Sequence, residues 1–215
     1  MKKFSSLLII IATMFLTRCS SPNILITSNK YHFPLNHSKI MTVGVIKDDN
    51  DSIRIRMEKS ITADLKGIGY EAVSALEEFG PKGLANLDQQ ETYLKLCNEG
   101  IDAVIIVALI DKTKEKQFRT QRSYAYAETY YYNRIWNYRN IQADLVDKNF
   151  TVTGTCFWEA ILFNLSTLET ECTIQSKSFS LPEDKIANQF EKQIVKKMIE
   201  EKILKKQNIT KLKPF

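Results

Sequence analysis

The amino-acid sequence predicts an α/β domain with a mixed sheet of about five strands. Two compact apolar runs rich in β-branched residues, 39–46 and 101–110, are typical of strands buried on both faces. Segments with helical periodicity lie between the strand-like runs, which gives the order β-α-β-α-β. Two further strand-like runs, 153–165 and 170–179, precede a long amphipathic segment. They predict an antiparallel hairpin followed by a C-terminal helix.

The first predicted helix follows the strand at 39–46. Asp51 or a neighbouring acid is expected to cap this helix, and Gly67 and Gly69 to end it. Its buried face is predicted from apolar residues that recur at intervals of three to four positions: Ile53, Met57, Ile61, Leu65 and Ile68. A short second strand is predicted next, at 70–75.

A second helix, predicted from Asp88 through Cys97 and closed by residues 98–100, leads into the strand at 101–110. Because strand–helix–strand crossovers are right-handed, we expect the three strands of this half to lie parallel. Cys97 shares a helix face with Tyr93 and Leu94, so it is predicted to be a buried structural thiol.

The hairpin allows a test of cysteine pairing. With residues 166–169 as its loop, the predicted register pairs Leu165 with Thr170, Phe163 with Cys172, and Ile161 with Ile174. Extending this register places Cys156 opposite Phe179 and on the other face from Cys172. No disulfide is therefore predicted, and both cysteines are expected to be buried free thiols.

The closing helix is predicted within residues 181–204. Pro182 suits its first turn, because proline lacks only an amide that has no helical partner there. Its buried stripe is predicted to consist of Ile186, Phe190, Ile194 and Met198.

The N-terminal stretch has the pattern of an export signal. Lys2 and Lys3 precede an apolar run over residues 7–16, which is too short for the roughly 20 residues of a membrane-spanning helix. The following residues, Leu16 to Cys19, resemble the bacterial lipobox, although Arg18 stands where a small residue is usual and is expected to slow processing. We predict a lipoprotein signal peptide at 1–18 and acylation of Cys19. A plain secreted protein and an uncleaved anchor are the alternatives.

Four further regions complete the predicted organisation. Residues 19–39 read as the lipidated cysteine and a flexible tether. A single α/β domain is predicted at 40–206, with an insertion at about 114–150, and a basic tail at 207–215. Both histidines, His32 and His37, fall in the tether, so the folded domain is predicted to contain none. Ser20, by the common sorting pattern, favours the outer membrane over the inner one, with the domain facing the periplasm.

Net charge and motifs exclude several classes of function. Loss of Lys2, Lys3 and Arg18 with the signal peptide lowers the formal charge from +5 to +2, which implies no strong polyanion partner. Without a histidine, the domain offers neither a Ser/His/Asp triad nor a Cys/His pair.

No cofactor or metal is predicted either. The acids at 48–51 follow a single glycine, so they form no phosphate loop, and they lack EF-hand spacing; capping and solvation are their expected roles. The cysteines match no zinc pattern. Glu159 is expected at a sheet edge or paired with a lysine, with a catalytic carboxylate as the alternative.

One segment, 118–139, concentrates residues typical of recognition surfaces. It holds six of the nine tyrosines and one of the two tryptophans. Three interpretations compete: a structural excursion between strands, a protein or glycan contact surface, and a single-stranded nucleic-acid site, which export argues against. The candidate partner-binding residues are Tyr124, Tyr126, Tyr130, Tyr132, Arg134 and Trp136.

The order of these segments resembles that of small bacterial envelope lipoproteins. The likeness rests on the export signal, MTVGVI at 41–46, GIDAVIIVALID at 100–111, the Tyr-rich segment and the hairpin WEAILFNLSTLETECTIQSKSF at 158–179. The domain is similar to the α/β module of the curli-secretion lipoprotein, of penicillin-binding-protein activator lipoproteins and of the TolB amino-terminal domain. In such relatives the hairpin turn commonly holds a glycine, which this chain lacks.

The resemblance implies fold and envelope location and carries no catalytic signature. We therefore predict a non-enzymatic outer-membrane lipoprotein, held by its lipid anchor, that binds or scaffolds another component of the periplasm. The partner is expected to be a protein, a glycan or a second copy of the chain, and not a nucleic acid. The alternatives are a hydrolase acting on cell wall or lipid, and a lipid-carrying envelope protein.

Overall fold

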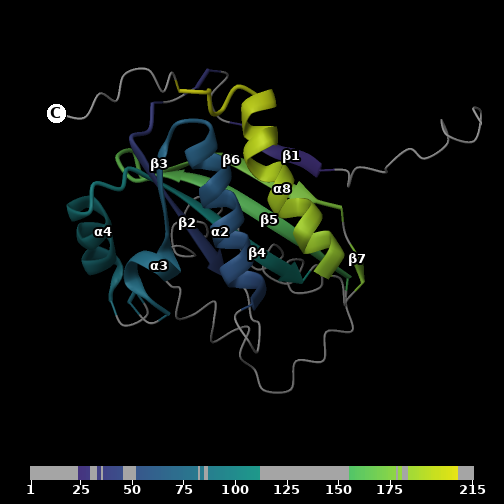
Figure 1. The fold of residues 1–215 in the computed structure, drawn as a ribbon, viewed down its shortest axis with the longest axis horizontal. Helices are drawn as coiled ribbons and strands as arrows, with labels where there is room; N and C mark the ends of the chain where they lie inside the picture. The colour runs from purple at the N-terminus through teal and green to yellow at the C-terminus, as the bar shows by residue number, and fades with distance from the viewer. Residues whose placement is uncertain are drawn as a thin grey trace, which may run out of the picture.

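A mixed sheet organises the chain in the computed structural model, which describes residues 24–29, 33–34, 36–45, 52–81, 83–84, 87–111, 155–177, 179–180 and 184–207. Its order is β1-β6-β5-β4-β2-β3, with β7 paired to β5 (Figure 1). The strands are β1 (Ile24–Asn29), β2 (Lys39–Val45), β3 (Glu71–Ser74), β4 (Ala103–Asp111), β5 (Thr155–Asn164), β6 (Glu169–Ser176) and β7 (Phe179–Ser180). The helices are α2 (Ser52–Gly67), α3 (Ala75–Phe79), α4 (Gln89–Asn98) and α8 (Asp184–Glu200).

The parallel half of the sheet confirms the predicted α/β class. β2 pairs in parallel with β4 on one side and with β3 on the other. α2 returns the chain from β2 to β3, and Met57, Ile61 and Leu65 of its predicted stripe are fully buried. Gly69 ends this helix region with a φ of +95°, a conformation that glycine adopts without steric cost.

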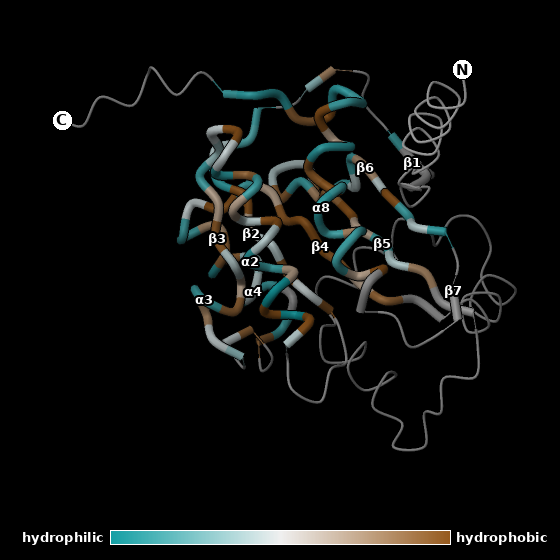
Figure 2. The backbone as a smooth tube through the Cα atoms, turned by 45° about the vertical axis from the view of Figure 1, so that its right-hand side comes forward, coloured by the Kyte–Doolittle hydropathy of each residue, from teal (hydrophilic) through white to brown (hydrophobic). Residues whose placement is uncertain are grey.

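Two apolar cores cover the two faces of the sheet. On one face, α2 and α8 lie side by side (Figure 1) and enclose Ile105, Leu162 and Ile174 from three neighbouring strands. On the other face, α3 and α4 pack Ala75 and Leu96 onto Met41 of β2. The central strand β4 is correspondingly apolar along most of its length (Figure 2).

The antiparallel half contains the predicted hairpin in a different register. Phe163 pairs with Thr170, but Leu162, not Phe163, pairs with Cys172. A register shift between Leu162 and Phe163 leaves Glu171 as the extra residue of β6. The predicted pairing was wrong by two positions at Thr170, whose partner is Phe163 and not Leu165, and the bulge reduces the difference to one position at Cys172. The pairing of Cys156 with Phe179 is confirmed through β7.

The prediction of a flexible tether is wrong for residues 24–29. They form β1, which pairs antiparallel with β6 from Ile24 opposite Ser176 to Asn29 opposite Cys172. The sheet therefore has an edge strand that precedes the predicted domain start at residue 40. A six-residue strand carries too few repeats to be recognised by periodicity. Its pairing partner, β6, also lies far along the chain.

α4 has the predicted start but turns a different face to the core. Asp88 caps it: Glu91 donates its backbone N–H to Asp88 Oδ1 at 2.8 Å, and Asp88 donates its own to Glu91 Oε2 at 2.9 Å. Thr92 and Leu96 are buried, whereas Cys97 and Leu94 are exposed. Cys97 is therefore not the buried thiol that its apolar neighbours predict.

The closing helix buries its predicted stripe, with Phe190, Ile194 and Met198 fully enclosed and Trp158 of β5 stacked on Phe190 at 6.4 Å between ring centroids. After α8, Ile203 donates its backbone N–H to the Met198 carbonyl at 2.8 Å. This bond requires Lys202 to adopt a φ of +59°. Within the described ranges, no helix combines the length and apolar character needed to cross a bilayer.

Replacement of Lys202 by glycine is expected to stabilise the protein by about 0.5–1 kcal/mol, because a side chain at positive φ costs energy that glycine avoids. The matched control is Lys196→Gly, within α8, which should destabilise by about 1 kcal/mol because glycine weakens a helix interior. Urea unfolding followed by circular dichroism measures both changes. Destabilisation by both variants would contradict the role assigned to Lys202.

Candidate functional site

The residues predicted to act lie outside the part of the chain that the structure describes. These are Cys19, Tyr124, Tyr126, Tyr130, Tyr132, Arg134 and Trp136. The candidate site is therefore built from the polar side chains that the described elements bring together. They form two clusters, one at each end of the parallel strands.

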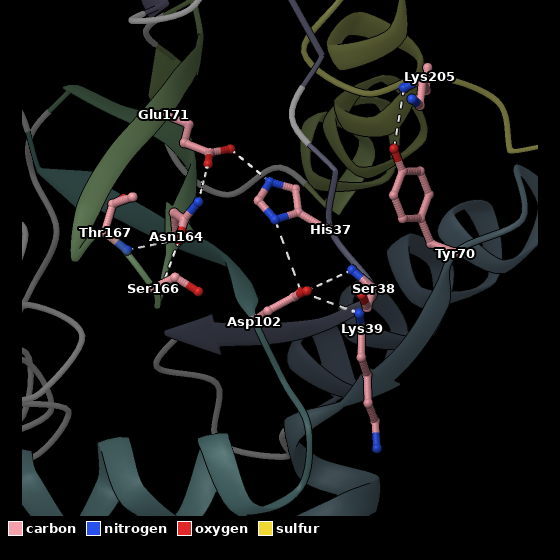
Figure 3. Close-up of polar contacts among 10 residues, drawn as sticks. All are labelled: His37, Ser38, Lys39, Tyr70, Asp102, Asn164, Ser166, Thr167, Glu171 and Lys205. Atoms are coloured by element: carbon pink, nitrogen blue, oxygen red, sulfur yellow. Dashed lines mark hydrogen bonds and ion pairs between the residues drawn. The ribbon is translucent and has the colours of Figure 1, made fainter.

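The first cluster, the histidine clamp, consists of His37, Asp102, Asn164 and Glu171. His37 is 6 % exposed and lies just before β2, so the prediction of a domain without histidine is wrong. Its Nε2 lies 2.9 Å from Glu171 Oε2, and its Nδ1 lies 4.0 Å from Asp102 Oδ1 (Figure 3). An ionised carboxylate only accepts hydrogen bonds, so Nε2 is the nitrogen that donates to Glu171.

Asp102 joins this histidine to the starts of two parallel strands. Its carboxylate accepts the backbone N–H of Ser38 at 2.6 Å and that of Lys39 at 3.2 Å. Its own backbone N–H donates to the Lys39 carbonyl at 3.1 Å, and its carbonyl accepts from Leu165 at 2.9 Å. Asp102 thus fixes the approach to β2, the start of β4 and the hairpin end in one place.

Asn164 couples the clamp to the hairpin turn. Its side-chain amide donates to Glu171 Oε1 at 2.7 Å. Its Oδ1 accepts the backbone N–H groups of Ser166 at 2.8 Å and Thr167 at 3.1 Å (Figure 3). These bonds shape the turn, in which Leu168 has a φ of +59°, a conformation that glycine adopts without steric cost.

The clamp is arranged for structure and not for nucleophilic chemistry. Both ring nitrogens of His37 face carboxylates, so neither is directed at a hydroxyl or thiol that it could deprotonate. The two carboxylates lie on opposite nitrogens and cannot share one metal ion with the ring. Throughout the described ranges, no group of three His, Cys, Asp or Glu residues is placed to hold a metal.

The second cluster centres on Glu58 of α2, which is fully buried. Oε1 accepts from the Gly44 N–H at 2.9 Å and from Arg54 Nε at 3.1 Å. Oε2 accepts from Ser74 Oγ at 2.6 Å and from the Leu76 N–H at 2.9 Å. A Cβ at position 44 would lie 3.0 Å from Arg54 Cγ, so a larger residue there would require Arg54 to shift. These four donors stabilise the carboxylate away from water and join β2, β3, α2 and α3.

Glu159 does not lie at a sheet edge, which was one of its two predicted settings. It lies on β5, which has β4 on one side and β6 on the other, and is 3 % exposed. Gln175 donates its amide to Glu159 Oε1 at 2.8 Å from the neighbouring strand. This cross-strand hydrogen bond gives the buried acceptor Glu159 Oε1 a donor.

Two buried groups near the core have raised pKa values. Burial raises the pKa of the Cys172 thiol to about 12, with smaller contributions from the nearby charges of Glu171 and Glu201. Burial also raises the pKa of Glu191, although Arg56, whose Nε lies 3.4 Å from Glu191 Oε2, opposes that shift. Cys172 is therefore a protonated, structural thiol at neutral pH.

The sequence contains a partial signal for the clamp. Because β2 and β4 are parallel neighbours, the residues that precede them, His37 and Asp102, must lie close together. Glu171 and Asn164 join them only through the hairpin and its bulge, whose register the sequence predicts incorrectly.

Coupling between His37 and Glu171 is expected from their contact. In a double-mutant cycle of His37→Ala and Glu171→Ala, the double variant should lose about 1–3 kcal/mol less stability than the sum of the losses in the two single variants. Urea unfolding measures each variant. The control cycle pairs His37→Ala with Glu78→Ala, an exposed site on α3, and should be additive within about 0.5 kcal/mol. Equal coupling in both cycles would contradict the clamp.

Cysteine reactivity is expected to separate Cys97 from Cys172. At near-neutral pH, N-ethylmaleimide should modify the exposed Cys97 in the native protein and leave Cys172 unmodified until urea is added, because Cys172 is buried and its pKa is about 12. Peptide mass spectrometry resolves the two sites. Equal modification rates in the native protein would show that Cys172 is accessible.

No protein-family model and no curated protein matches the sequence. Among solved structures, the chain is similar to a PelC dodecamer from Paraburkholderia phytofirmans, with 9 % identity, a TM-score of 0.43 and coverage of 85 % of this chain and 98 % of that chain. It is also similar to the lipoprotein GNA1162 from Neisseria meningitidis, with 14 % identity, a TM-score of 0.35 and coverage of 75 % and 96 %. At TM-scores below 0.5, these likenesses decide neither function nor assembly.

Proposed function

We propose that the protein is a non-enzymatic lipoprotein of the cell envelope, held to the outer membrane through acylated Cys19. The observation that supports this most directly is the apolar run 7–16, which follows two lysines and ends in a lipobox-like stretch at Cys19. Two or more acyl chains give stable anchoring, because each buried methylene contributes about 0.8 kcal/mol.

The polar clusters support a non-enzymatic role. A catalytic base or nucleophile needs a side chain directed at substrate with its reacting atom free. The polar atoms of these clusters instead face neighbouring polar side chains or backbone amides, as seen for His37, Glu171, Asp102 and Glu58. They stabilise the junctions between elements, and no observation favours the hydrolase or lipid-carrier alternatives.

The proposed activity is to bind or scaffold another envelope component in the periplasm. Tyr124, Tyr126, Tyr130, Tyr132, Arg134 and Trp136 are the proposed contact residues, because tyrosine, tryptophan and arginine combine a large buried area with a polar tip. A protein or glycan fits this chemistry, and a second copy of the chain is included among the protein partners.

Replacement of Cys19 by serine is expected to release the protein from the membrane fraction, since serine cannot accept the thioether-linked diacylglycerol. Fractionation of native cells and intact-mass measurement of the N-terminal peptide test this. The control, Cys97→Ser, removes an exposed thiol elsewhere and should leave fractionation unchanged. An unmodified thiol at Cys19 in the wild-type protein would refute the proposal.

A further inference from the structure

The length of chain between Cys19 and the folded sheet is short. β1 begins at Ile24, only five residues after Cys19. Whatever path residues 20–23 take, five residues span at most about 18 Å. The predicted tether of residues 19–39 would let the domain move well away from the anchor, whereas a connection of five residues keeps Ile24 within about 18 Å of Cys19.

Ile24 lies at one corner of the sheet. β1 is the edge strand, and Ile24 pairs with Ser176 at the end of β6. β7 continues from that end and pairs with the first residues of β5. The anchored corner is therefore formed by the start of β1, the end of β6 and β7. The hairpin turn lies at the opposite end of the sheet (Figure 1).

The sheet is larger than the connection in both directions. The eight residues of β6 carry the chain about 25 Å from the hairpin to the anchored corner. Five strand spacings separate β1 from β3 at the other edge, or about 24 Å. The anchored corner can thus stay near the bilayer while the hairpin end and the β3 edge are, on average, farther away.

Resting on the proposed acylation of Cys19, we infer that the domain is held in a preferred orientation on the bilayer. The corner that contains Ile24, Ser176 and β7 faces the lipid surface, and the histidine clamp and β3 face away from it. Asp111 and Thr155, the described residues that flank 112–154, lie at the membrane-facing end because Asp111 pairs with Cys156.

Three exposed positions report this orientation along two directions. Lys177 follows Ser176 at the anchored corner, and Thr167 lies in the hairpin turn. Glu78 lies on α3, the helix that follows the edge strand β3. Each is changed to cysteine and labelled with a fluorophore in a background of Cys97→Ser and Cys156→Ser. The acylated protein is placed in phosphatidylethanolamine/phosphatidylglycerol vesicles that carry a headgroup nitroxide quencher. Protection of Cys172 from maleimide verifies that each variant is folded.

Lys177→Cys is expected to lose most of its fluorescence, and Thr167→Cys and Glu78→Cys to lose little. Equal loss at the three positions, or the greatest loss at 167 or 78, would overturn the inference. As a matched control, ten Gly/Ser residues inserted after Ser21 add up to about 35 Å of chain and should abolish the difference. Persistence of the difference in that variant would show that the short connection is not its cause.

Failure of the proposed function gives a different result. If Cys19 carries no acyl chain, the protein does not remain on the vesicles and no position is quenched, so that the anchor and the orientation are both refuted. If Cys19 is acylated and the protein is bound, but quenching is uniform, only the orientation is refuted. The Cys19→Ser variant provides the unanchored baseline.

Discussion

The hydrogen bond from His37 to Glu171 fastens the N-terminal part of the chain to the C-terminal hairpin, across 134 residues of sequence. Glu171 is also the bulged residue of β6, and Asn164 donates to its other oxygen from the facing strand. Because both partners of this bond are almost fully buried, loss of either leaves the other without its main partner in a site poor in water. The position of residues 36–38, which lead into β2, therefore depends on this contact.

The Glu58 cluster has the same role at the other end of the parallel strands. A fully buried carboxylate is costly unless donors surround it, and Glu58 has four, from β2, α2, β3 and the start of α3. Gly44 leaves room for the Arg54 side chain, since a Cβ at position 44 would lie 3.0 Å from Arg54 Cγ. Such a cluster favours one alignment of helix and strands over others, since a shifted alignment would leave a charge unpaired.

Local patterns predicted the elements that local interactions form. The stripe of Met57, Ile61 and Leu65 repeats at the helical period, and Asp88 with Glu91 forms a capping box within four residues. The class of the fold followed from these segments. Features that depend on pairing between distant residues were not predicted by these local patterns. β1 forms by pairing with β6, and the bulge at Glu171 shifts the register of the hairpin by one residue.

The candidate site shows the same division. His37 and Asp102 are neighbours because β2 and β4 are parallel, which the sequence predicts. The sequence does not predict the contact of His37 with Glu171, because that contact depends on the register of the distant hairpin. Cys97 illustrates the opposite error: three apolar residues on one helix face suggested burial, yet the core takes Thr92 and Leu96 instead. Apolar character alone does not determine which face of a short helix meets the sheet.

The presence of β1 determines how a restraint on the N-terminal region is transmitted to the sheet. A flexible connection of some twenty residues transmits no orientation, because its ends sample many directions. A strand hydrogen bonded along the sheet edge is part of a rigid body, and Asn29 is tied to β6 while His37 is tied to Glu171 only eight residues later. Any force or restraint that acts on Ile24 is therefore transmitted to the whole sheet. In this chain residues 24–29 are therefore part of the folded domain and not only a link that precedes it.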